Sequence, residues 1–244
     1  MKTLFVSWRE ATTGERIPVA RLDWDGSFYR FSYTKGALRA TSFEPFGKMI
    51  DLRGVYRSDK LFAMFLNRLI SKSRPEYLDY LRWMGLNPSV GDEMDELGIS
   101  GGRRGTDSIE VVPMPVRNEA GNYSVEFFAR GLLHFNASCV EAVKQLREGD
   151  RLWLVKDAQN AFDTYAMFMR TENPIHSVGY VPRLYAKDLG HMLDRFGSEV
   201  DVRVKRVNDD APLSMRLLCT LNAPWFEGFR PFATEDFVSL SHGE

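Results

Sequence analysis

Short apolar runs bounded by turn residues open the chain. Residues 4–8 form one such run, and residues 19–24 alternate apolar with polar side chains, a pattern that is typical of strands. Asp25-Gly26 follows as a hairpin turn signal, and residues 28–33 supply a third, aromatic-rich strand. The first 35 residues therefore predict a small antiparallel sheet.

The apolar pattern then becomes helical. Apolar side chains recur at i, i+4 and i+8 over residues 61–70, which predicts a helix with one wide apolar face. Pro75 opens a second helix that Gly85 ends, and residues 88–97 predict a third, short and acidic helix. Residues 109–116 return to a strand pattern, and their two prolines suit the edge of a sheet.

The second half of the chain mixes strands with two helices. Ser138 and Glu141 form a capping box before a helix over residues 139–147. A longer helix begins after Pro182, which suits a first helical turn, and ends at Gly197. The predicted strands cover residues 124–130, 152–157, 164–169, 177–181, 200–207 and 214–221.

Turn residues over 118–122 mark a domain boundary. The pattern thus predicts an α+β protein with two domains, residues 1–120 and residues 121–244. Parallel strands through residues 152–181 would contradict this prediction. The C-terminal tail, with Trp225, Phe226, Phe229 and Phe232, is too aromatic to lie free in water, and we expect it to pack on a domain.

Composition narrows the class of protein. The 244 residues are 44% hydrophobic and 27% charged, which is ordinary for a soluble globular protein of one or two domains. A net charge of −1 argues against a protein that coats nucleic acid by bulk electrostatics. It leaves room for a small site that grips one strand end with a few groups.

The sequence predicts no metal site and no cofactor. The two cysteines, Cys139 and Cys219, are far apart in apolar settings and predict buried, reduced thiols in a cytoplasmic protein. No paired Cys-x-x-Cys motif and no Gly-rich nucleotide loop occur. We also expect no signal peptide and no membrane span, because no run of roughly 18 apolar residues exists.

An ordered set of motifs lies between residues 128 and 207. A Gly-Leu pair and a Gly-Asp pair precede an Asn-x-Phe-Asp loop, and a Gly-Tyr-Val-Pro-Arg turn follows. Taken in this order, the motifs resemble the HIRAN domain. They are Gly131-Leu132, Gly149-Asp150, Asn160, Phe162-Asp163, Ala166, Gly179-Tyr180-Val181-Pro182-Arg183 and Ala186.

The resemblance implies a small β-barrel that binds single-stranded DNA at its free 3′ end, often attached to a DNA-remodelling enzyme. Phe162 and Tyr180 would stack on bases, a contact worth about 1–3 kcal/mol per base. Asn160 would meet a sugar or base edge, and Asp163 would accept a hydrogen bond from the terminal hydroxyl. Arg183, at a helix start, would meet a phosphate. In a structural alternative, Phe162 lies in the core and Asp163 only caps a turn.

Four more residues are candidates for the interface. His134 and Phe135 stand where the HIRAN family usually shows Arg or Tyr residues that contact DNA, and they can still donate or stack. This departure bears on the affinity and on the 3′-end preference. Arg203 and Lys205 lie on the predicted strand 200–207, which we expect at an exposed edge with one basic face. They would either contact the DNA backbone or form a solvated face.

The first half resembles the N-terminal subdomain of HipA-like kinases. The resemblance rests on the strand Phe31-Ser32-Tyr33, the helices over residues 61–84 and the Gly101-Gly102 loop. The kinase body is absent from the sequence, because no phosphate-cradling loop and no catalytic Asp and Asn pair can be placed. No kinase activity is therefore predicted.

Two classes of function follow. The first is a non-catalytic protein that binds single-stranded DNA at free 3′ ends, as an accessory subunit in DNA repair or phage defence. The second is a protein-interaction or antitoxin-like subunit that docks on a HipA-like kinase, a nuclease or a helicase. A triad of Ser138, His134 and Asp163 can be drawn, but Ser138 is explained as a helix cap and no nucleophile elbow accompanies it. No enzyme is predicted.

Overall fold

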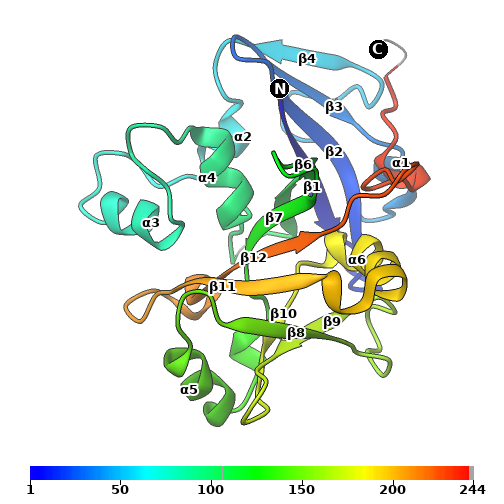
Figure 1. Cartoon of the computed structure of the whole chain (residues 1–244). Helices are drawn as coiled ribbons and strands as arrows, with labels where there is room; N and C mark the ends of the chain where they lie inside the picture. The colour runs from blue at the N-terminus through cyan, green and yellow to red at the C-terminus, as the bar shows by residue number, and fades with distance from the viewer. Residues whose placement is uncertain (106, 242–244) are drawn as a thin grey trace. The chain divides into compact units, whose positions relative to one another are not determined.

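The computed structural model describes residues 1–105 and 107–241 (Figure 1). The chain forms two compact units. Unit 1 combines residues 1–81 and 86–114 with the C-terminal segment from Phe232, and unit 2 combines residues 82–85 and 115–231. The predicted domains, 1–120 and 121–244, divide the chain differently at its C-terminal end. The end of the predicted second domain, residues 242–244, lies outside the described residues.

Unit 1 is built on an antiparallel sheet, as the sequence predicted. Within its described residues the sheet has five strands in the order β4-β3-β2-β1-β5. The predicted hairpin is confirmed, since the Asp25 side chain accepts hydrogen bonds from the N–H groups of Ser27 and Phe28, both at 2.8 Å. The strands are β1 (Lys2–Arg9), β2 (Arg16–Trp24), β3 (Tyr29–Tyr33), β4 (Val55–Ser58) and β5 (Ile109–Pro113), and β5 lies at an edge as its prolines predicted.

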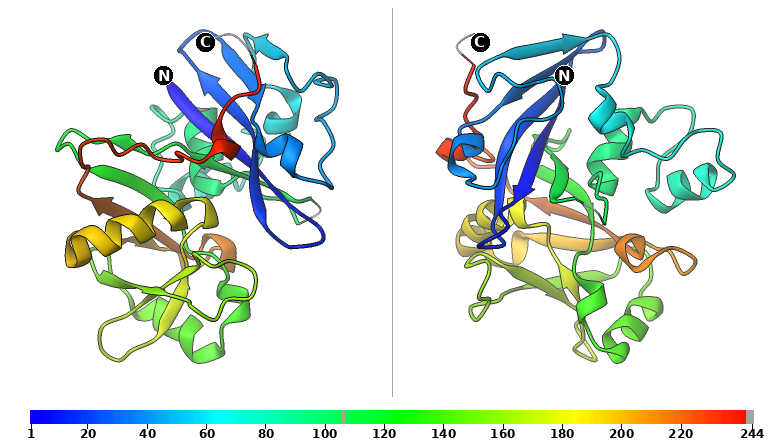
Figure 2. Two further views of the ribbon diagram at one scale, coloured as in Figure 1. Left: turned by 90° about the vertical axis from the view of Figure 1, so that its right-hand side faces the viewer. Right: turned by 180° about the vertical axis from the view of Figure 1, so that it is seen from behind.

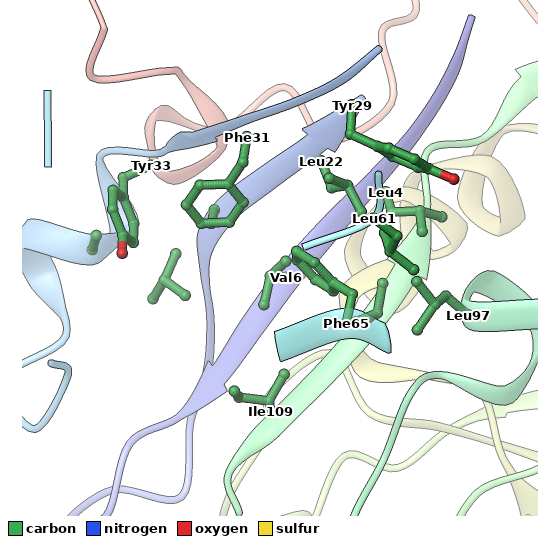
Figure 3. Close-up of a cluster of buried hydrophobic side chains, with 14 of the residues drawn as sticks. Leu4, Val6, Leu22, Tyr29, Phe31, Tyr33, Leu61, Phe65, Leu97 and Ile109 are labelled. Carbon is green, nitrogen blue, oxygen red and sulfur yellow. The ribbon is translucent and has the colours of Figure 1, made fainter. Parts of the chain in front are cut away.

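One apolar core fills unit 1 (Figure 3). Side chains at alternate positions of a strand lie on the same face of the sheet, so Leu4 and Val6 of β1 reach this core together. Phe31 of β3 is fully buried and meets Phe65 at a ring-centroid distance of 6.1 Å. The core therefore joins the sheet to the helical segment that lies between β4 and β5 in the chain.

The helices of unit 1 are shorter than predicted. The helix predicted over residues 61–70 shrinks to the four residues of α2, because the N–H groups of Arg68 and Leu69 turn back to carbonyls three residues earlier. The Arg68 guanidinium pairs with the Asp107 carboxylate at 2.5 Å, so a tertiary contact is made where the predicted helix would have continued. The helices are α1 (Gly36–Arg39), α2 (Ala63–Leu66), α3 (Tyr77–Trp83) and α4 (Glu93–Ser100), with a 3₁₀ turn over Glu235–Phe237. The last two residues of α3 group with unit 2.

The aromatic tail divides between the two units. Trp225 and Phe229 meet Tyr123 of unit 2, at ring-centroid distances of 6.3 and 6.1 Å. Phe232 stacks on Phe237 at 4.6 Å, and both rings pack edge-on against Phe5 of unit 1. The segment from Phe232 therefore groups with unit 1, whereas the prediction placed it in the second domain, 121–244.

Unit 2 holds the second antiparallel sheet (Figure 2). Within the described part of this unit the strand order is β10-β9-β8-β11-β12-β7-β6, with every neighbouring pair antiparallel. The parallel arrangement that would have contradicted the prediction is not found among these strands. The strands are β6 (Val116–Arg117), β7 (Tyr123–Phe128), β8 (Arg151–Lys156), β9 (Met167–Arg170), β10 (Ser177–Tyr180), β11 (Asp201–Val207) and β12 (Leu217–Ala223).

The prediction that residues 200–207 form an edge strand is wrong. β11 pairs with β8 on one side and with β12 on the other, so it lies inside the sheet. Val202 and Val204 are buried while Arg203 between them is exposed. The alternation of apolar and basic residues reflects the two faces of an inner strand rather than an exposed edge.

A bridge brings the far end of the sheet back to β7. Tyr180 at the end of β10 and Arg130, two residues past β7, exchange two backbone hydrogen bonds of 2.8 Å each. Among the described strands, β10 and β6 are the two edges of the sheet, so the predicted closed barrel is not seen. The Arg130–Tyr180 bridge is the contact that links β10 to the end of β7. It fixes the end of β10, which carries part of the predicted site.

Two helices accompany the sheet of unit 2. α6 (Arg183–Phe196) begins and ends where the sequence predicted, whereas α5 (Ala137–Gln145) begins earlier. The cap of α5 is Asn136 and not Ser138, because the Asn136 side chain accepts the Cys139 N–H at 3.0 Å and the Ser138 hydroxyl at 2.7 Å. Across the described residues, no helix has the length and apolar character that crossing a membrane requires. Short 3₁₀ turns cover Leu132–His134, Gly197–Glu199 and Leu213–Met215.

Candidate nucleic-acid interface

The loop between β8 and β9 is fixed by its own side chains. The Asn160 carbonyl oxygen accepts the N–H groups of Phe162 and Asp163 at 3.1 and 3.0 Å. The Asn160 N–H in turn donates to the Asp157 carbonyl oxygen at 3.1 Å. Asn side chains commonly hold turns in this way. Asn160, predicted to contact a sugar or base, therefore shapes the loop that presents Phe162 and Asp163.

Asp157 ties this loop to the end of β10. Its Oδ2 accepts the Asn160 side-chain N–H at 3.0 Å and the Tyr180 hydroxyl at 2.8 Å. The bond from Asn160 and then the bond from Tyr180 lower the pKa of the Asp157 carboxyl. Burial, together with the Asp157 contact, raises the pKa of Tyr180 to about 12. Asp157 is thus an ionised acceptor and Tyr180 a neutral donor at neutral pH.

A second tie joins the same loop to the start of α6. Arg183 Nε lies 3.0 Å from Asp163 Oδ2, and the Arg183 guanidinium also donates to the Phe162 carbonyl oxygen. The Asp163 and Arg183 side chains remain 14% and 23% exposed. A cation is disfavoured at a helix N-terminus unless an anion is present, and Asp163 supplies that anion. The loop therefore has two anchor points, one on β10 and one on α6.

Aromatic rings border both anchor points. Tyr180 stacks on Phe135 at a centroid distance of 5.7 Å and an interplanar angle of 27°. Gly131, with φ +77°, lets the Tyr180 ring approach closely, since a Cβ there would lie 3.3 Å from the ring. Phe162 is 71% exposed and Tyr165 47% exposed, so the alternative that placed Phe162 in the core is wrong. Stacking surface is available at this site.

The remaining predicted residues divide. His134 is exposed in the 3₁₀ turn just before Phe135, close in sequence to the stacked pair. Arg203 and Lys205 lie on β11, which β8 and β9 separate from β10 in the sheet. The Arg203 guanidinium pairs with Asp201 at 2.7 Å, and the Lys205 ammonium pairs with Glu126 at 2.5 Å. The structure therefore does not bring these two cations to the loop.

Two residues at the site were missed from sequence. Asp157 was treated only as the boundary between a strand and the polar loop, although its spacing of three residues before Asn160 is typical of side chains that close a turn. Tyr165 was assigned to a strand over residues 164–169, but β9 begins at Met167. The Tyr165 N–H donates to the Asp163 side chain at 3.0 Å, so Tyr165 belongs to the loop.

A cavity of about 630 Å³ lies at the opposite end of β8 and β9. Its walls are one face of α5 and the turn over residues 171–176, and none of the predicted site residues lines it. Glu141, Asp150 and Glu172 are among its lining residues, and such carboxylates disfavour a phosphate. Among the described residues, no cluster of three or more His, Cys, Asp or Glu side chains could hold a metal ion.

A family model matches most of unit 2. Residues 122–225 match the family model described as the HIRAN domain. The solved HIRAN domain of human HLTF is 14% identical, with 41% of this chain and 74% of that chain covered and a TM-score of 0.32. A protein from Lactobacillus plantarum is 18% identical, with 42% and 97% covered and a TM-score of 0.32. No curated protein matches the chain. The chain therefore carries a HIRAN domain over residues 122–225.

Proposed function

We propose that this chain binds single-stranded DNA at a free 3′ end through the loop over residues 157–165 and the turn over residues 180–183. One observation carries the proposal. The loop and the turn carry the two motifs and lie about 20 residues apart in the sequence, which is the spacing of Asp163 from Arg183. In the structure they are joined by the Asp157–Tyr180 hydrogen bond and the Asp163–Arg183 ion pair. The HIRAN domain over residues 122–225 supports it, because the family resemblance implies recognition of single-stranded 3′ ends.

Each side chain has a distinct proposed role. Phe162, exposed on a loop that the Asn160 side chain holds by hydrogen bonds, stacks on a base and tolerates any sequence. Asp163 already accepts from Tyr165 and Arg183, but an ionised carboxylate has about four acceptor positions, so it can also accept the terminal hydroxyl. Arg183 contacts a phosphate while it holds Asp163 in place. Tyr180 and Phe135 form the adjacent stacked platform.

Asn160 acts indirectly in this proposal, by holding the backbone under Phe162 and Asp163. His134, exposed and next to Phe135 in the sequence, is a further donor for a phosphate in this proposal. Arg203 and Lys205 are left out, since each is paired with a carboxylate on the inner part of the sheet. The site then uses few cations, which fits a chain whose net charge is −1.

Phe162→Ala is expected to weaken binding of a single-stranded oligonucleotide by about 1–3 kcal/mol with little change in salt dependence, because it removes stacking and no charge. Fluorescence anisotropy with a 5′-labelled strand bearing a free 3′ hydroxyl measures the effect. Phe28→Ala, which removes another partly exposed ring in unit 1, is the matched control and should bind like the parent.

The parent should also prefer the free end over a 3′-phosphorylated strand, whose added charge Asp163 repels. Equal binding of both strands by the parent would count against end recognition.

We also propose that the chain has no catalytic activity of its own. Two members of the hypothetical Ser138, His134 and Asp163 triad have other partners. The Ser138 hydroxyl donates to the Asn136 side chain, and Asp163 pairs with Arg183. The purified chain is expected to release no phosphate from ATP and to leave labelled single strands intact when Mg²⁺ or Mn²⁺ is added. Turnover that a point substitution in this chain abolishes would refute the proposal.

The accessory role is a further proposal. Every residue proposed to contact DNA belongs to unit 2, so unit 1 is available for attachment to a kinase, nuclease or helicase. The segments behind the HipA-like resemblance have their counterparts in β3, α2, α3 and the Gly101-Gly102 turn before β5, but the relationship stays a prediction. A cytoplasmic location is likewise a prediction.

A further inference from the structure

Helix α6 carries a basic residue at every fourth position along one side. Arg183, Lys187 and Arg195 are four and eight residues apart, and His191 occupies the position between the last two. Residues four apart lie above one another on the helix surface, with a rise of about 6 Å per step. Figure 2 shows the helix, in yellow, beside the strands of unit 2. The stripe begins at Arg183, which belongs to the candidate site.

The opposite side of α6 is its buried side. Tyr185, Leu189 and Met192 are inaccessible to solvent, whereas His191 and Arg195 are exposed and Lys187 is partly exposed. The basic stripe therefore lies on the surface that the unit 2 core leaves open. It extends over about 18 Å from Arg183 to Arg195.

Aromatic rings lie beside the cations of this stripe. The Lys187 ammonium lies 5.6 Å from the centroid of Tyr165, a ring that is itself 47% exposed. The Arg195 guanidinium lies 4.5 Å from the Phe226 centroid and 5.6 Å from that of Phe196. Cations interleaved with rings are the combination that holds single strands without regard to sequence.

The charges along the stripe are only partly compensated. Asp163 is committed to Arg183, and Asp194 is committed to Lys156 at 2.5 Å. Within residues 1–105 and 107–241, neither Lys187 nor Arg195 pairs with a carboxylate. Two cations beside aromatic rings thus extend the site away from the loop.

We propose that the exposed side of α6 is a track, a surface that binds the nucleotides preceding the 3′ end. The bound strand has its 3′ end near Arg183 and extends along the helix toward Arg195, so that its 5′ side lies near Arg195. The inference rests on the proposed function, which places the terminal nucleotide at the loop. Lys187 and Arg195 contact successive phosphates, and bases lie against Tyr165 and against the guanidinium plane of Arg195. An unstacked strand extends to roughly twice the 3.4 Å per nucleotide of a duplex strand, so the track holds about three nucleotides.

Isothermal titration calorimetry of the full chain with unlabelled oligothymidylates tests the track. The affinity for strands with a free 3′ hydroxyl is expected to rise from dT2 to about dT5 and then level off, because the track then ends. The double variant Lys187→Gln, Arg195→Gln should bind dT2 like the parent and dT6 about tenfold more weakly at 0.1 M salt. The slope of log affinity against log salt for dT6 should fall by roughly 1.4, at about 0.7 per lost contact.

A matched double variant, Lys48→Gln with Lys144→Gln, removes two exposed cations outside α6 and should leave dT6 binding and its salt slope unchanged. If the parent binds dT2 and dT6 equally, end recognition stands and the track is refuted. The track is also refuted if the α6 variant loses dT2 and dT6 binding to the same extent, or if the control loses as much as the α6 variant. A parent that binds no oligothymidylate refutes both the track and the proposed function.

Discussion

Gly179→Ala is expected to lower the free energy of unfolding of unit 2 by about 2–4 kcal/mol. Gly179 has φ +124°, a conformation that residues with a Cβ rarely adopt. An added Cβ would also lie 2.8 Å from the Ala129 Cβ and 3.1 Å from the Arg130 carbonyl oxygen. The end of β10 would have to move away from Arg130. That movement breaks the bridge that brings Tyr180 to its place in the site.

Urea unfolding followed by circular dichroism measures the loss, and hydrogen exchange of the Arg130 and Tyr180 amides localises it, because these amides donate across the bridge. Gly149→Ala is the matched control. Gly149 also has a positive φ, +87°, but no atom lies within 4 Å of its added Cβ. It should cost only the backbone strain, about 1 kcal/mol. Equal losses in both variants would mean that the approach to Ala129 does not constrain β10.

The sequence predicted those elements whose signals are local. β2, β3 and their turn follow from alternation around Asp25-Gly26, and α6 follows from Pro182 before it and Gly197 after it. These residues act through their own backbone conformation or through near neighbours. Their effect is therefore visible without knowledge of the rest of the fold.

Errors arose where a distant residue decides the outcome. The helix expected over residues 61–70 is limited to Ala63–Leu66, and Arg68 just beyond it pairs with the distant Asp107. The strand expected at an edge became an inner one because β8 and β12 both pair with it. An alternation of apolar and basic residues is the same in the sequence of an edge strand and of an inner strand with one exposed face. Only the sheet order separates the two cases.

The candidate site shows the same division. The two motifs contain Asn160, Phe162, Asp163, Tyr180 and Arg183, and the fold brings their segments together. The motifs could not predict that Asp163 and Arg183 pair with each other. They also could not predict that the Asn160 side chain forms its hydrogen bonds within the loop. A pattern gives the residues of a site, whereas the distances between side chains decide which of them are partners.

That pairing gives the last prediction, in which Arg183→Ala weakens binding of a free 3′ end by about 2–3 kcal/mol, or roughly 30- to 150-fold. The substitution removes a phosphate contact. It also leaves the Asp163 carboxylate without the cation at 3.0 Å, so an uncompensated negative charge lies beside the incoming phosphate. Adding Asp163→Asn to Arg183→Ala should therefore restore part of the affinity, although Asp163→Asn alone weakens recognition of the terminal hydroxyl.

Anisotropy titrations of the parent, both single variants and the double variant complete a double-mutant cycle, and we expect an interaction free energy of about 1–2 kcal/mol. Thermal unfolding of each variant checks that unit 2 stays folded. Arg203→Ala breaks another Arg–Asp pair of unit 2, with Asp201 at 2.7 Å, and should leave binding within about twofold of the parent because β11 lies outside the site. Strictly additive losses in the cycle would show that Asp163 and Arg183 act independently on the DNA. A loss from Arg203→Ala as large as that from Arg183→Ala would move the interface to the β11 face.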